Sequence, residues 1–271
     1  MSEDTIAFIG GGNMARSLIS GLLNAGTEPR NIAVSDPVPM PRELLGELGV
    51  RVCADNDEAL TGARVVVLAV KPQVLGDVLV SLPVTPDQLL VSIAAGVPIA
   101  AMAAWTRADQ PIVRCMPNTP ALLGAGVTAL YASATVDDAG RALAEQILAA
   151  AGRTLWVDEE AKLDAVTAVS GSGPAYFFYL MEAMIEAGIE QGLDAETATV
   201  LTLETAYGAA LMARERTDTP AVLRANVTSP GGTTAAALAA LDAADSAATI
   251  RSALAAAGER ARTLAEEFGQ S

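Results

Sequence analysis

The chain contains no histidine among its 271 residues and only two lysines, Lys71 and Lys162. The absence of histidine excludes Ser-His-Asp and Cys-His nucleophiles, and any zinc site that uses imidazole. Two cysteines, Cys53 and Cys115, are too few for a disulfide framework or a metal-binding cluster. We therefore predict no metal site, and we expect a chain that works in a reducing compartment.

Basic charge and long apolar runs are also scarce. Lys and Arg number 17 against 32 Asp and Glu, and the resulting net charge of −15 disfavours binding to nucleic-acid phosphates. The longest wholly apolar runs fall far short of the roughly 20 residues that a membrane-spanning helix needs. The N-terminus lacks the layout of a signal peptide. We expect an acidic, soluble, cytoplasmic protein with no nucleic-acid or membrane partner. The length of the chain is typical of two domains.

The first half alternates β-rich segments with helical ones. One run of apolar residues, 65–70, is typical of a strand buried on both faces of a parallel sheet. Strands separated by helices imply βαβ units. We therefore predict that residues 1–158 form an α/β Rossmann domain with a doubly wound, mostly parallel sheet. The predicted strands are 5–9, 32–35, 50–53, 65–70, 89–93, 112–115, 127–131 and 154–157, with helices at 13–25 and 136–151.

The second half is predicted to be helical. Its segments are rich in Ala, Gly, Leu and Met on more than one face, and a helix of that kind needs partners on several sides. Asp194 and Thr219 are predicted N-caps, and Thr233 is predicted to open a later helix. We predict that residues 159–271 form an all-α oligomerisation domain and that the protein is a homo-oligomer built through it.

A glycine-rich turn follows the first predicted strand and opens the first predicted helix. Its sequence is Gly10-Gly11-Gly12-Asn13-Met14-Ala15, a G-x-G-x-x-A pattern. The first glycine permits a tight turn, the second lets the backbone approach a pyrophosphate, and Ala15 packs where helix and strand meet. Free N–H groups at the helix N-terminus favour the anion. The pattern predicts a dinucleotide site, with a purely structural turn as the alternative.

The end of the second predicted strand bears on the choice of cofactor. Asp36 stands 24 residues after Gly12, where an acidic side chain binds the ribose 2′-OH of NAD. Ser35 could instead hydrogen-bond a 2′-phosphate, with Arg42 as a nearby cation. Asp36 could also be no more than a turn residue before Pro37. These residues leave the choice between NADH and NADPH open.

Other segments at predicted strand ends are candidates for ligand contact. The run Ala69-Val70-Lys71-Pro72 lies at the carboxyl end of the central strand, where ligands bind in doubly wound sheets. Lys71 is thus predicted to contact cofactor or substrate, with a surface lysine as the alternative. Asn118 and Thr119 offer neutral hydrogen-bond donors in a loop that could equally be a rigid structural element. Residues 170–174 form a small-residue turn that is either an anion cradle or a close domain crossing.

The segment 227–234 carries several hydroxyl groups and backbone N–H groups at a predicted helix start. Such a nest of donors suits a small carboxylate. The alternative is a capped turn between two helices.

Together these motifs resemble the pyrroline-5-carboxylate reductase family. The matching segments appear in the family's order across about residues 5–240, and they include VTAVSGSGPAY at 166–176 and VTSPGGTT at 227–234. The resemblance implies a Rossmann domain followed by a helical domain that interlocks between subunits, in dimers that often form decamers. It also implies reduction of 1-pyrroline-5-carboxylate to L-proline by hydride from NAD(P)H, the last step of proline biosynthesis.

The resemblance assigns roles to individual residues. Thr234 is the predicted catalytic residue, which orients the iminium N–H or passes a proton from water. NADPH is slightly favoured as cofactor because family members usually prefer it, although Asp36 departs from the commonest pattern. The predicted cofactor-binding residues are Gly10, Gly11, Gly12, Asn13, Met14, Ala15, Ser35, Asp36, Asn56, Ala69, Val70, Lys71 and Pro72. The predicted substrate-binding residues are Asn226, Ser229, Gly231, Gly232, Thr233 and Thr234.

Two other functions fit parts of the pattern. A β-hydroxyacid dehydrogenase or related imine reductase shares the fold, and the former would need a lysine near the substrate, for which Lys162 is the candidate. A non-enzymic dinucleotide-binding redox sensor is the second alternative, but it gives the hydroxyl-rich 227–234 segment no purpose.

Overall fold

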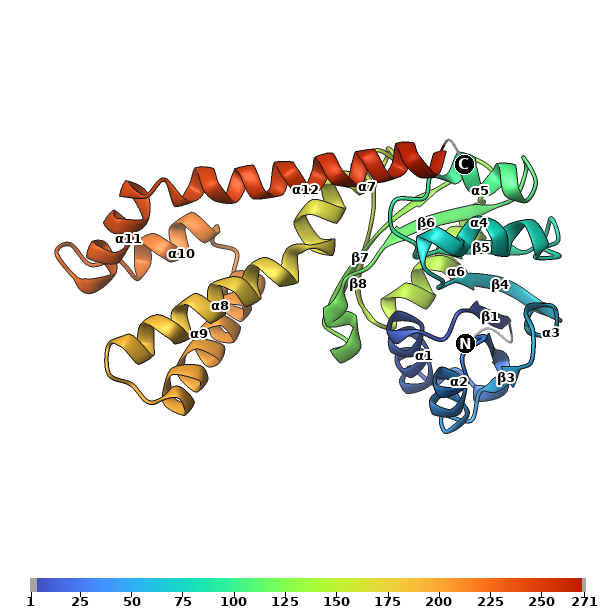
Figure 1. Cartoon of the computed structure of the whole chain (residues 1–271), viewed down its shortest axis with the longest axis horizontal. Coiled ribbons are helices and arrows are strands. Elements are labelled where there is room, and N and C mark those ends of the chain that lie inside the picture. Colours follow the sequence, from blue (N-terminus) through green and yellow to red (C-terminus); the bar gives the residue numbers. More distant parts are fainter. Residues whose placement is uncertain (1–3, 270–271) are drawn as a thin grey trace. The chain divides into compact units, whose positions relative to one another are not determined.

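The computed structural model of the chain describes residues 4–269. By their internal contacts these residues divide into two compact units. The first consists of residues up to Ser172 together with those from Ala257, and the second is Gly173–Ala256. The first unit contains the sheet, whereas the described elements of the second are helices (Figure 1).

The sheet has the strand order β3-β2-β1-β4-β5-β6-β7-β8. The strands are β1 (Thr5–Ile9), β2 (Ile32–Ser35), β3 (Arg51–Cys53), β4 (Ala63–Leu68), β5 (Leu89–Ser92), β6 (Ile112–Met116), β7 (Gly126–Ala132) and β8 (Gly152–Trp156). The first six are parallel, and β7 reverses direction against β6. This is the Rossmann order, whose topological switch point lies between β1 and β4. The predicted fold class is confirmed.

Two apolar layers cover the faces of this sheet. Successive strand residues point to opposite faces, so Phe8 joins one cluster of buried side chains and Ile9 the other. The same alternation places Val67 and Leu68 on opposite faces, each fully buried, which explains the continuous apolar run in this strand. The covering helices are α1 (Asn13–Asn24), α2 (Pro39–Gly46), α3 (Asn56–Leu60), α4 (Pro72–Ser81), α5 (Ile99–Trp105) and α6 (Asp138–Ala149), with short helical turns η1 (Pro29–Asn31) and η2 (Thr119–Leu123).

The predicted bounds of β4 and β8 are shifted by about two residues. We predicted 65–70 for β4, but it ends at Leu68, because the chain turns into α4, which Lys71 caps and Pro72 begins. A proline at the first helical position favours this helix start. Ala69 still donates its N–H to the carbonyl of Ile9 at 2.8 Å, so it stays at the edge of the sheet.

The second unit is built from α8 (Gly173–Glu190), α9 (Ala195–Glu215), α10 (Pro220–Asn226), α11 (Thr233–Ala243) and the first half of α12 (Ser246–Gly269). Both predicted N-caps are confirmed: Asp194 accepts the N–H of Thr197, and Thr219 accepts that of Val222. Within residues 4–269, no helix combines the length and apolar character needed to cross a bilayer.

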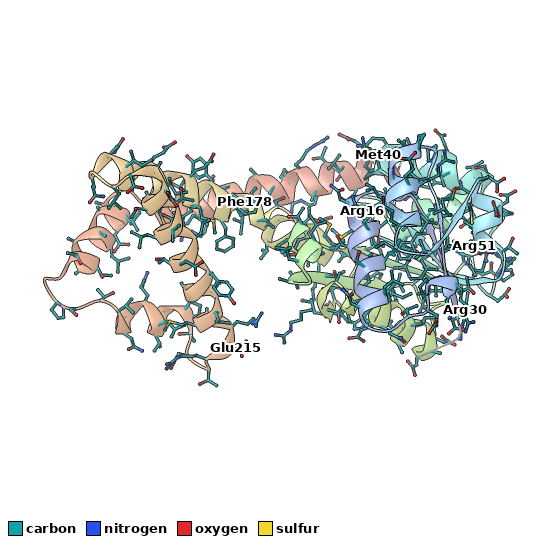
Figure 2. The ribbon with its side chains drawn as sticks, turned by 90° about the horizontal axis from the view of Figure 1, so that it is seen from below. Arg16, Arg30, Met40, Arg51, Phe178 and Glu215 are labelled. Atoms are coloured by element: carbon teal, nitrogen blue, oxygen red, sulfur yellow. The ribbon has the colours of Figure 1, made fainter. Side chains whose placement is uncertain are left out.

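The helices of this unit expose large apolar side chains. On α8, Phe177, Phe178, Tyr179 and Leu180 are each between 55% and 75% exposed. Consecutive residues of an α-helix point in different directions around its axis, and Phe178 is labelled in Figure 2. A helix apolar around its circumference is normally covered on several sides. The sequence-based expectation that these helices are apolar on more than one face is therefore confirmed.

The segment 170–174 contains a bend at Ser172 and the start of α8 at Gly173, which agrees with the predicted small-residue turn at a helix start. After α7 (Lys162–Val166), residues Thr167–Gly171 form a π-helical turn that continues into α8. The N–H of Ser172 donates to the carbonyl of Thr167 at 2.8 Å, and the Ser170 hydroxyl donates to that of Val166 at 3.0 Å. Both bonds run back to the preceding turn of the helix, and back-bonding by a serine hydroxyl is typical of places where a helix bends.

A buried ion network ties α7 to the sheet. Arg114 of β6 is 5% exposed and pairs with Glu160 at 2.8 Å, and its second terminal nitrogen lies 3.9 Å from Asp164. Glu160 also accepts the N–H of Ile99, the first residue of α5. These contacts join α7 to the sheet, and both belong to the first compact unit, whose first segment ends at Ser172. The division into domains at 158/159 stays a prediction.

The carboxyl of Asp164 gives a prediction about pH. Burial raises its pKa above the ordinary value of 3.8, while Arg114 and Arg262 oppose that rise. The ionised form therefore destabilises the fold at neutral pH, and this cost is relieved as pH falls from the raised pKa toward 3.8. We expect the melting temperature of the wild type to rise relative to Asp164→Asn over that window, as measured by circular dichroism.

The exposed Asp158 is the matched control, because its bond to Lys162 lowers the pKa of its carboxyl. Asp158→Asn should behave in the opposite sense, with wild type losing its advantage as the solution becomes acidic. A melting difference between wild type and Asp164→Asn that does not change with pH would contradict the prediction.

Candidate functional site

The glycine turn joins β1 to α1 and is held by the strands on either side. Gly10 has a φ of +100°, and a Cβ at this position would lie 2.7 Å from the carbonyl oxygen of Ala69. The N–H of Gly10 donates to the carbonyl of Ser35 at 2.8 Å. The turn thus touches the ends of both β2 and β4, and only glycine fits there.

Gly12 occupies a different environment. It is the N-cap of α1 with no side-chain cap, and a Cβ built on it would meet nothing within 4 Å. Open space beside a helix N-terminus allows an anion to approach the free N–H groups. Asn13 is exposed beside it, whereas Ala15 is fully buried in the core and contributes packing rather than contact. The turn fits a pyrophosphate.

Asp36 holds the glycine turn directly. One carboxylate oxygen accepts the N–H of Gly11 at 2.7 Å, and the other accepts that of Val38 at 2.7 Å. Ser35 is 4% exposed, whereas Arg42 is half-buried and faces a hollow lined by residues of α2 and the end of β3. A carboxylate has about four acceptor positions, so Asp36 can serve the turn and still accept a ribose hydroxyl.

The other predicted cofactor residues lie at the carboxyl edge of the same sheet. Ala69 and Val70 follow β4 and are half-buried, and Lys71 is exposed at the N-cap of α4. Asn56 is the first residue of α3, which follows β3 and is capped by the carboxylate of Asp55 through the N–H of Glu58. Because these strands are parallel, their carboxyl ends share one edge with the glycine turn.

The predicted substrate residues gather in the second unit. Asn226 ends α10, and the loop that follows turns at Gly231, whose φ is +70°. Gly232 is the N-cap of α11 without a side-chain cap, and its own N–H donates to the carbonyl of Ser229 at 3.0 Å. Thr233 and half-buried Thr234 are the first residues of the helix. Their backbone N–H groups have no partner within the helix and suit a carboxylate.

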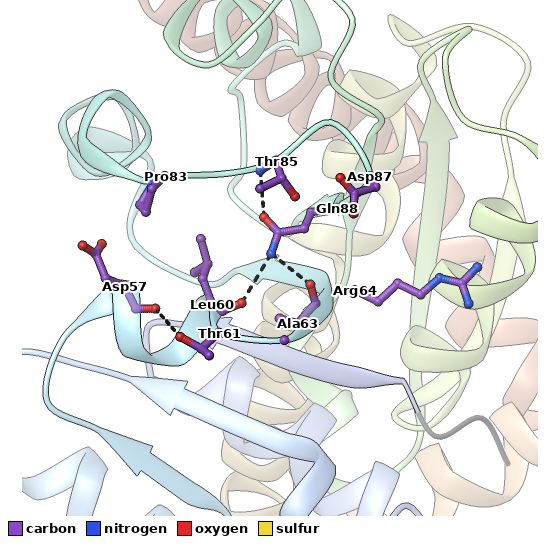
Figure 3. A pocket seen from close by; sticks show the side chains of 10 residues that line it. Asp57, Leu60, Thr61, Ala63, Arg64, Pro83, Thr85, Asp87 and Gln88 are labelled. Atoms are coloured by element: carbon purple, nitrogen blue, oxygen red, sulfur yellow. Dashed lines mark hydrogen bonds between the residues drawn. The ribbon is translucent and has the colours of Figure 1, made fainter.

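Another pocket of the first unit lies away from the glycine turn. Its lining includes Ala63 and Gln88, labelled in Figure 3, which stand at the amino ends of β4 and β5. The glycine turn follows the carboxyl end of β1, so the pocket lies at the opposite edge of the parallel sheet. Gln88 spans it, accepting the N–H of Thr85 at 2.9 Å and donating to the carbonyl of Ala63 at 2.9 Å. Ligands of doubly wound sheets bind at the carboxyl edge, so we assign this pocket a structural role.

Hydrogen bonds and ion pairs decide between the alternative roles that the sequence left open for Lys162 and Asn118. Lys162 is an exposed residue paired with Asp158 at 2.5 Å and Glu159 at 3.5 Å, which does not favour the catalytic lysine of a hydroxyacid dehydrogenase. Both polar groups of Asn118 are engaged: its Nδ2 donates to the carbonyl of Ser170 at 3.2 Å, and its Oδ1 accepts the N–H of Val127 at 2.9 Å. Asn118 therefore belongs to a rigid structural loop.

The buried ion pair between Arg114 and Glu160 was not predicted from the sequence. The available signal was an arginine within the otherwise apolar strand IVRCM, because a buried charge requires a partner. Its partner lies 46 positions away, and no local pattern identifies it.

A glycine turn at the switch point of a parallel sheet, with an uncapped helix N-terminus beside it, defines a dinucleotide-dependent oxidoreductase of the Rossmann class. Family models agree: residues 5–96 match "NADP oxidoreductase coenzyme F420-dependent" and residues 160–264 match "Pyrroline-5-carboxylate reductase dimerisation". The chain belongs to the pyrroline-5-carboxylate reductase family.

Relatives and solved structures support this membership over the full length. The chain is 52% identical to the pyrroline-5-carboxylate reductase of Pseudomonas aeruginosa, with 100% of both chains covered. It is 43% identical to that of Haemophilus influenzae, covering 99% of this chain and 100% of the relative. A solved Coxiella burnetii pyrroline-5-carboxylate reductase superposes with a TM-score of 0.90 at 41% identity, covering 97% and 99%. The Plasmodium falciparum enzyme, solved with NADP bound, gives 0.87 at 29% identity, covering 98% and 99%.

The different roles of Gly10 and Gly12 in the turn can be distinguished by mutation. Gly10→Ala should destabilise the fold by at least about 1–3 kcal/mol, because a positive φ is strained for alanine and its Cβ would overlap the Ala69 carbonyl. Gly12→Ala should cost less than about 1 kcal/mol in stability. It should nevertheless weaken NAD(P)H binding at least about tenfold, because the alanine Cβ fills the open space beside the N-terminus of α1, where we expect the pyrophosphate.

Melting temperature and calorimetric titration with NADPH and NADH measure the two effects. Unchanged cofactor affinity in Gly12→Ala would show that the pyrophosphate binds elsewhere.

Proposed function

We propose that the chain reduces 1-pyrroline-5-carboxylate to L-proline with hydride from NAD(P)H. The observation that carries this proposal is the turn with its open Gly12, in a chain that aligns end to end with pyrroline-5-carboxylate reductases. The bound dinucleotide supplies a hydride to the imine carbon, and one proton from solution completes the amine. The ring nitrogen can carry that proton before hydride transfer, so the reaction needs no strong protein acid.

The protein's part in this reaction is binding and orientation. The N–H groups at the start of α11 hold the substrate carboxylate, and the Thr234 hydroxyl orients the ring N–H or relays a proton from water. A threonine hydroxyl does not ionise near neutral pH, so Thr234 is not a proton source alone. Most of the rate enhancement comes from fixing the imine carbon against the hydride donor.

We propose that both NADPH and NADH serve, with a slight preference for NADPH. The NADP bound to the Plasmodium falciparum relative supports use of the phosphorylated cofactor, and Arg42 offers a cation near the end of β3. Asp36 limits the preference because its carboxylate repels a 2′-phosphate. Parallel activity assays with NADPH and with NADH measure this cofactor preference.

Thr234→Ala should lower kcat about 10- to 100-fold while leaving the Kd for NAD(P)H within about twofold, because the hydroxyl acts on the substrate. The assay follows NAD(P)H oxidation with pyrroline-5-carboxylate, with a 3-hydroxy acid and a no-substrate sample as controls. Thr199→Ala is the matched variant, since this hydroxyl donates only to the carbonyl of Ala195 on exposed α9. Equal kcat values in wild type and Thr234→Ala would remove Thr234 from the mechanism. Wild type inactive on the imine would overturn the proposed function.

We propose that the working molecule is a homodimer, or a larger assembly such as a decamer built from dimers. The match of residues 160–264 to a dimerisation model and the exposed aromatic residues of α8 support this. Monomeric proteins rarely expose a large contiguous apolar surface to solvent. Sedimentation at micromolar concentration should show a dimer or a multiple of it, and Phe178→Glu should shift the distribution to smaller species. A stable wild-type monomer would contradict the proposal.

A further inference from the structure

The carboxyl end of β6 is fastened to the π-helical turn Thr167–Gly171 by contacts of different kinds. Asn118 donates to the carbonyl of Ser170 at 3.2 Å. Gly171 packs against the side chain of Met116, and a Cβ built on this glycine would overlap the terminal methyl carbon of that side chain. Two residues earlier on the strand, Arg114 pairs with Glu160 just before α7. We call this set of contacts the β6 clamp.

The β6 clamp lies at the edge of the sheet where the nicotinamide end of the cofactor is expected to bind. The glycine turn and Asp36 lie on the β1–β2–β3 half of the sheet, which takes the adenosine end of a dinucleotide. The other mononucleotide half is β4–β5–β6, so the nicotinamide end belongs at the carboxyl ends of those strands. Met116 ends β6, and Asn118 follows it at that edge.

Asn118 is the residue that joins the parts of the clamp. Its Oδ1 accepts the N–H of Val127 at the start of β7, while its Nδ2 reaches the π turn. One side chain thereby fixes the loop after β6 both to β7, nine positions on, and to the π turn, 52 positions on. π-helical turns are rare and often occur at functional sites, and the bond from Asn118 holds one carbonyl of this turn.

We infer that Asn118 is a positioning residue for hydride transfer, which fixes the π turn Thr167–Gly171 against the strand end that faces the nicotinamide. The inference rests on the proposed function. Asn118 acts through the backbone that it holds, not through contact with substrate. Small displacements of reacting groups, on the order of 1 Å, cost about 100-fold in rate.

Asn118→Asp is the sharpest test. The new side chain has the same size and can still accept the N–H of Val127, but it cannot donate to the carbonyl of Ser170. We expect kcat to fall about 10- to 100-fold while the Kd for NAD(P)H changes less than about threefold. We also expect the primary isotope effect with [4-²H]NAD(P)H to rise, since hydride transfer becomes rate-limiting in place of product release.

The chain offers a matched control at the opposite edge of the sheet. Gln88 makes the same two kinds of bond, accepting from the N–H of Thr85 and donating to the carbonyl of Ala63. Gln88→Glu removes that donor in the same way. It should lower the melting temperature while leaving kcat and the isotope effect as in wild type. If Gln88→Glu lowers kcat and raises the isotope effect equally, the effect of Asn118→Asp is general destabilisation and the inference fails.

Amide hydrogen exchange separates this inference from the proposed function. In Asn118→Asp, exchange in residues 167–172 should become faster than in wild type, whether or not the imine is the substrate. Asn118→Ala should do the same and serves if the aspartate variant does not fold. Unchanged exchange in a folded variant would show that Asn118 does not hold the π turn. Faster exchange with unchanged kcat and isotope effect would overturn its role in hydride transfer. An inactive wild type would instead overturn the proposed function.

Discussion

The contact between Gly10 and the carbonyl group of Ala69 is the constraint on which the cofactor site depends. The turn after β1 is tied to β2 by the bond from Gly10 to Ser35, and to β4 by the bond from Ala69 to Ile9. A side chain at Gly10 would separate the turn from β4 and carry the start of α1 away from the switch point of the sheet. The uncapped N–H groups of α1 point toward a ligand only because this turn is closed.

Small residues also meet at two helix crossings of this chain. Gly188 lies against Ala198 between α8 and α9, and Gly258 of α12 lies against Ala168 of the π turn. Short side chains permit close crossings but bury little apolar area each, and stabilisation by burial scales with that area. The second unit therefore has few buried residues of its own, and the larger apolar side chains of α8 remain exposed in a single chain.

The local parts of the fold could be predicted from the sequence, whereas the long-range parts could not. Residues 32–35 and 5–9 were predicted as strands and are strands, because burial on both faces selects uninterrupted β-branched and apolar residues. The break between α11 and α12 was not predicted. It depends on Asp245 adopting a φ of +47°, which an alanine-rich sequence does not indicate. Helix propensity continues through this point, and the hydrogen bonds around Asp245 are local ones, from its N–H to the carbonyl of Asp242 and from the N–H of Thr249 to its own carbonyl.

The candidate site residues also divide into those that a local sequence motif identifies and those whose role depends on long-range contacts. Gly10 and Gly12 could be identified because a local motif places them, although only the structure shows that one touches backbone and the other faces open space. The role of Asn118 could not be identified, because its partner Ser170 is 52 positions away. The dual contact of Asp36 was missed for a similar reason, since its bond to Gly11 spans 25 positions.

The net charge of −15 disfavours the binding of anions, whereas backbone N–H groups favour it, and these two effects act over different distances. Salt screens exposed charges beyond about 8 Å at physiological ionic strength, whereas backbone N–H groups act at hydrogen-bond distance. The acidic residue nearest the glycine turn is Asp36, and both its oxygens accept backbone N–H groups at 2.7 Å, which disperses its charge. Backbone N–H groups also do not titrate near neutral pH. In a chain without histidine, the affinity of such a site for an anion therefore follows the protonation of the ligand rather than that of the protein.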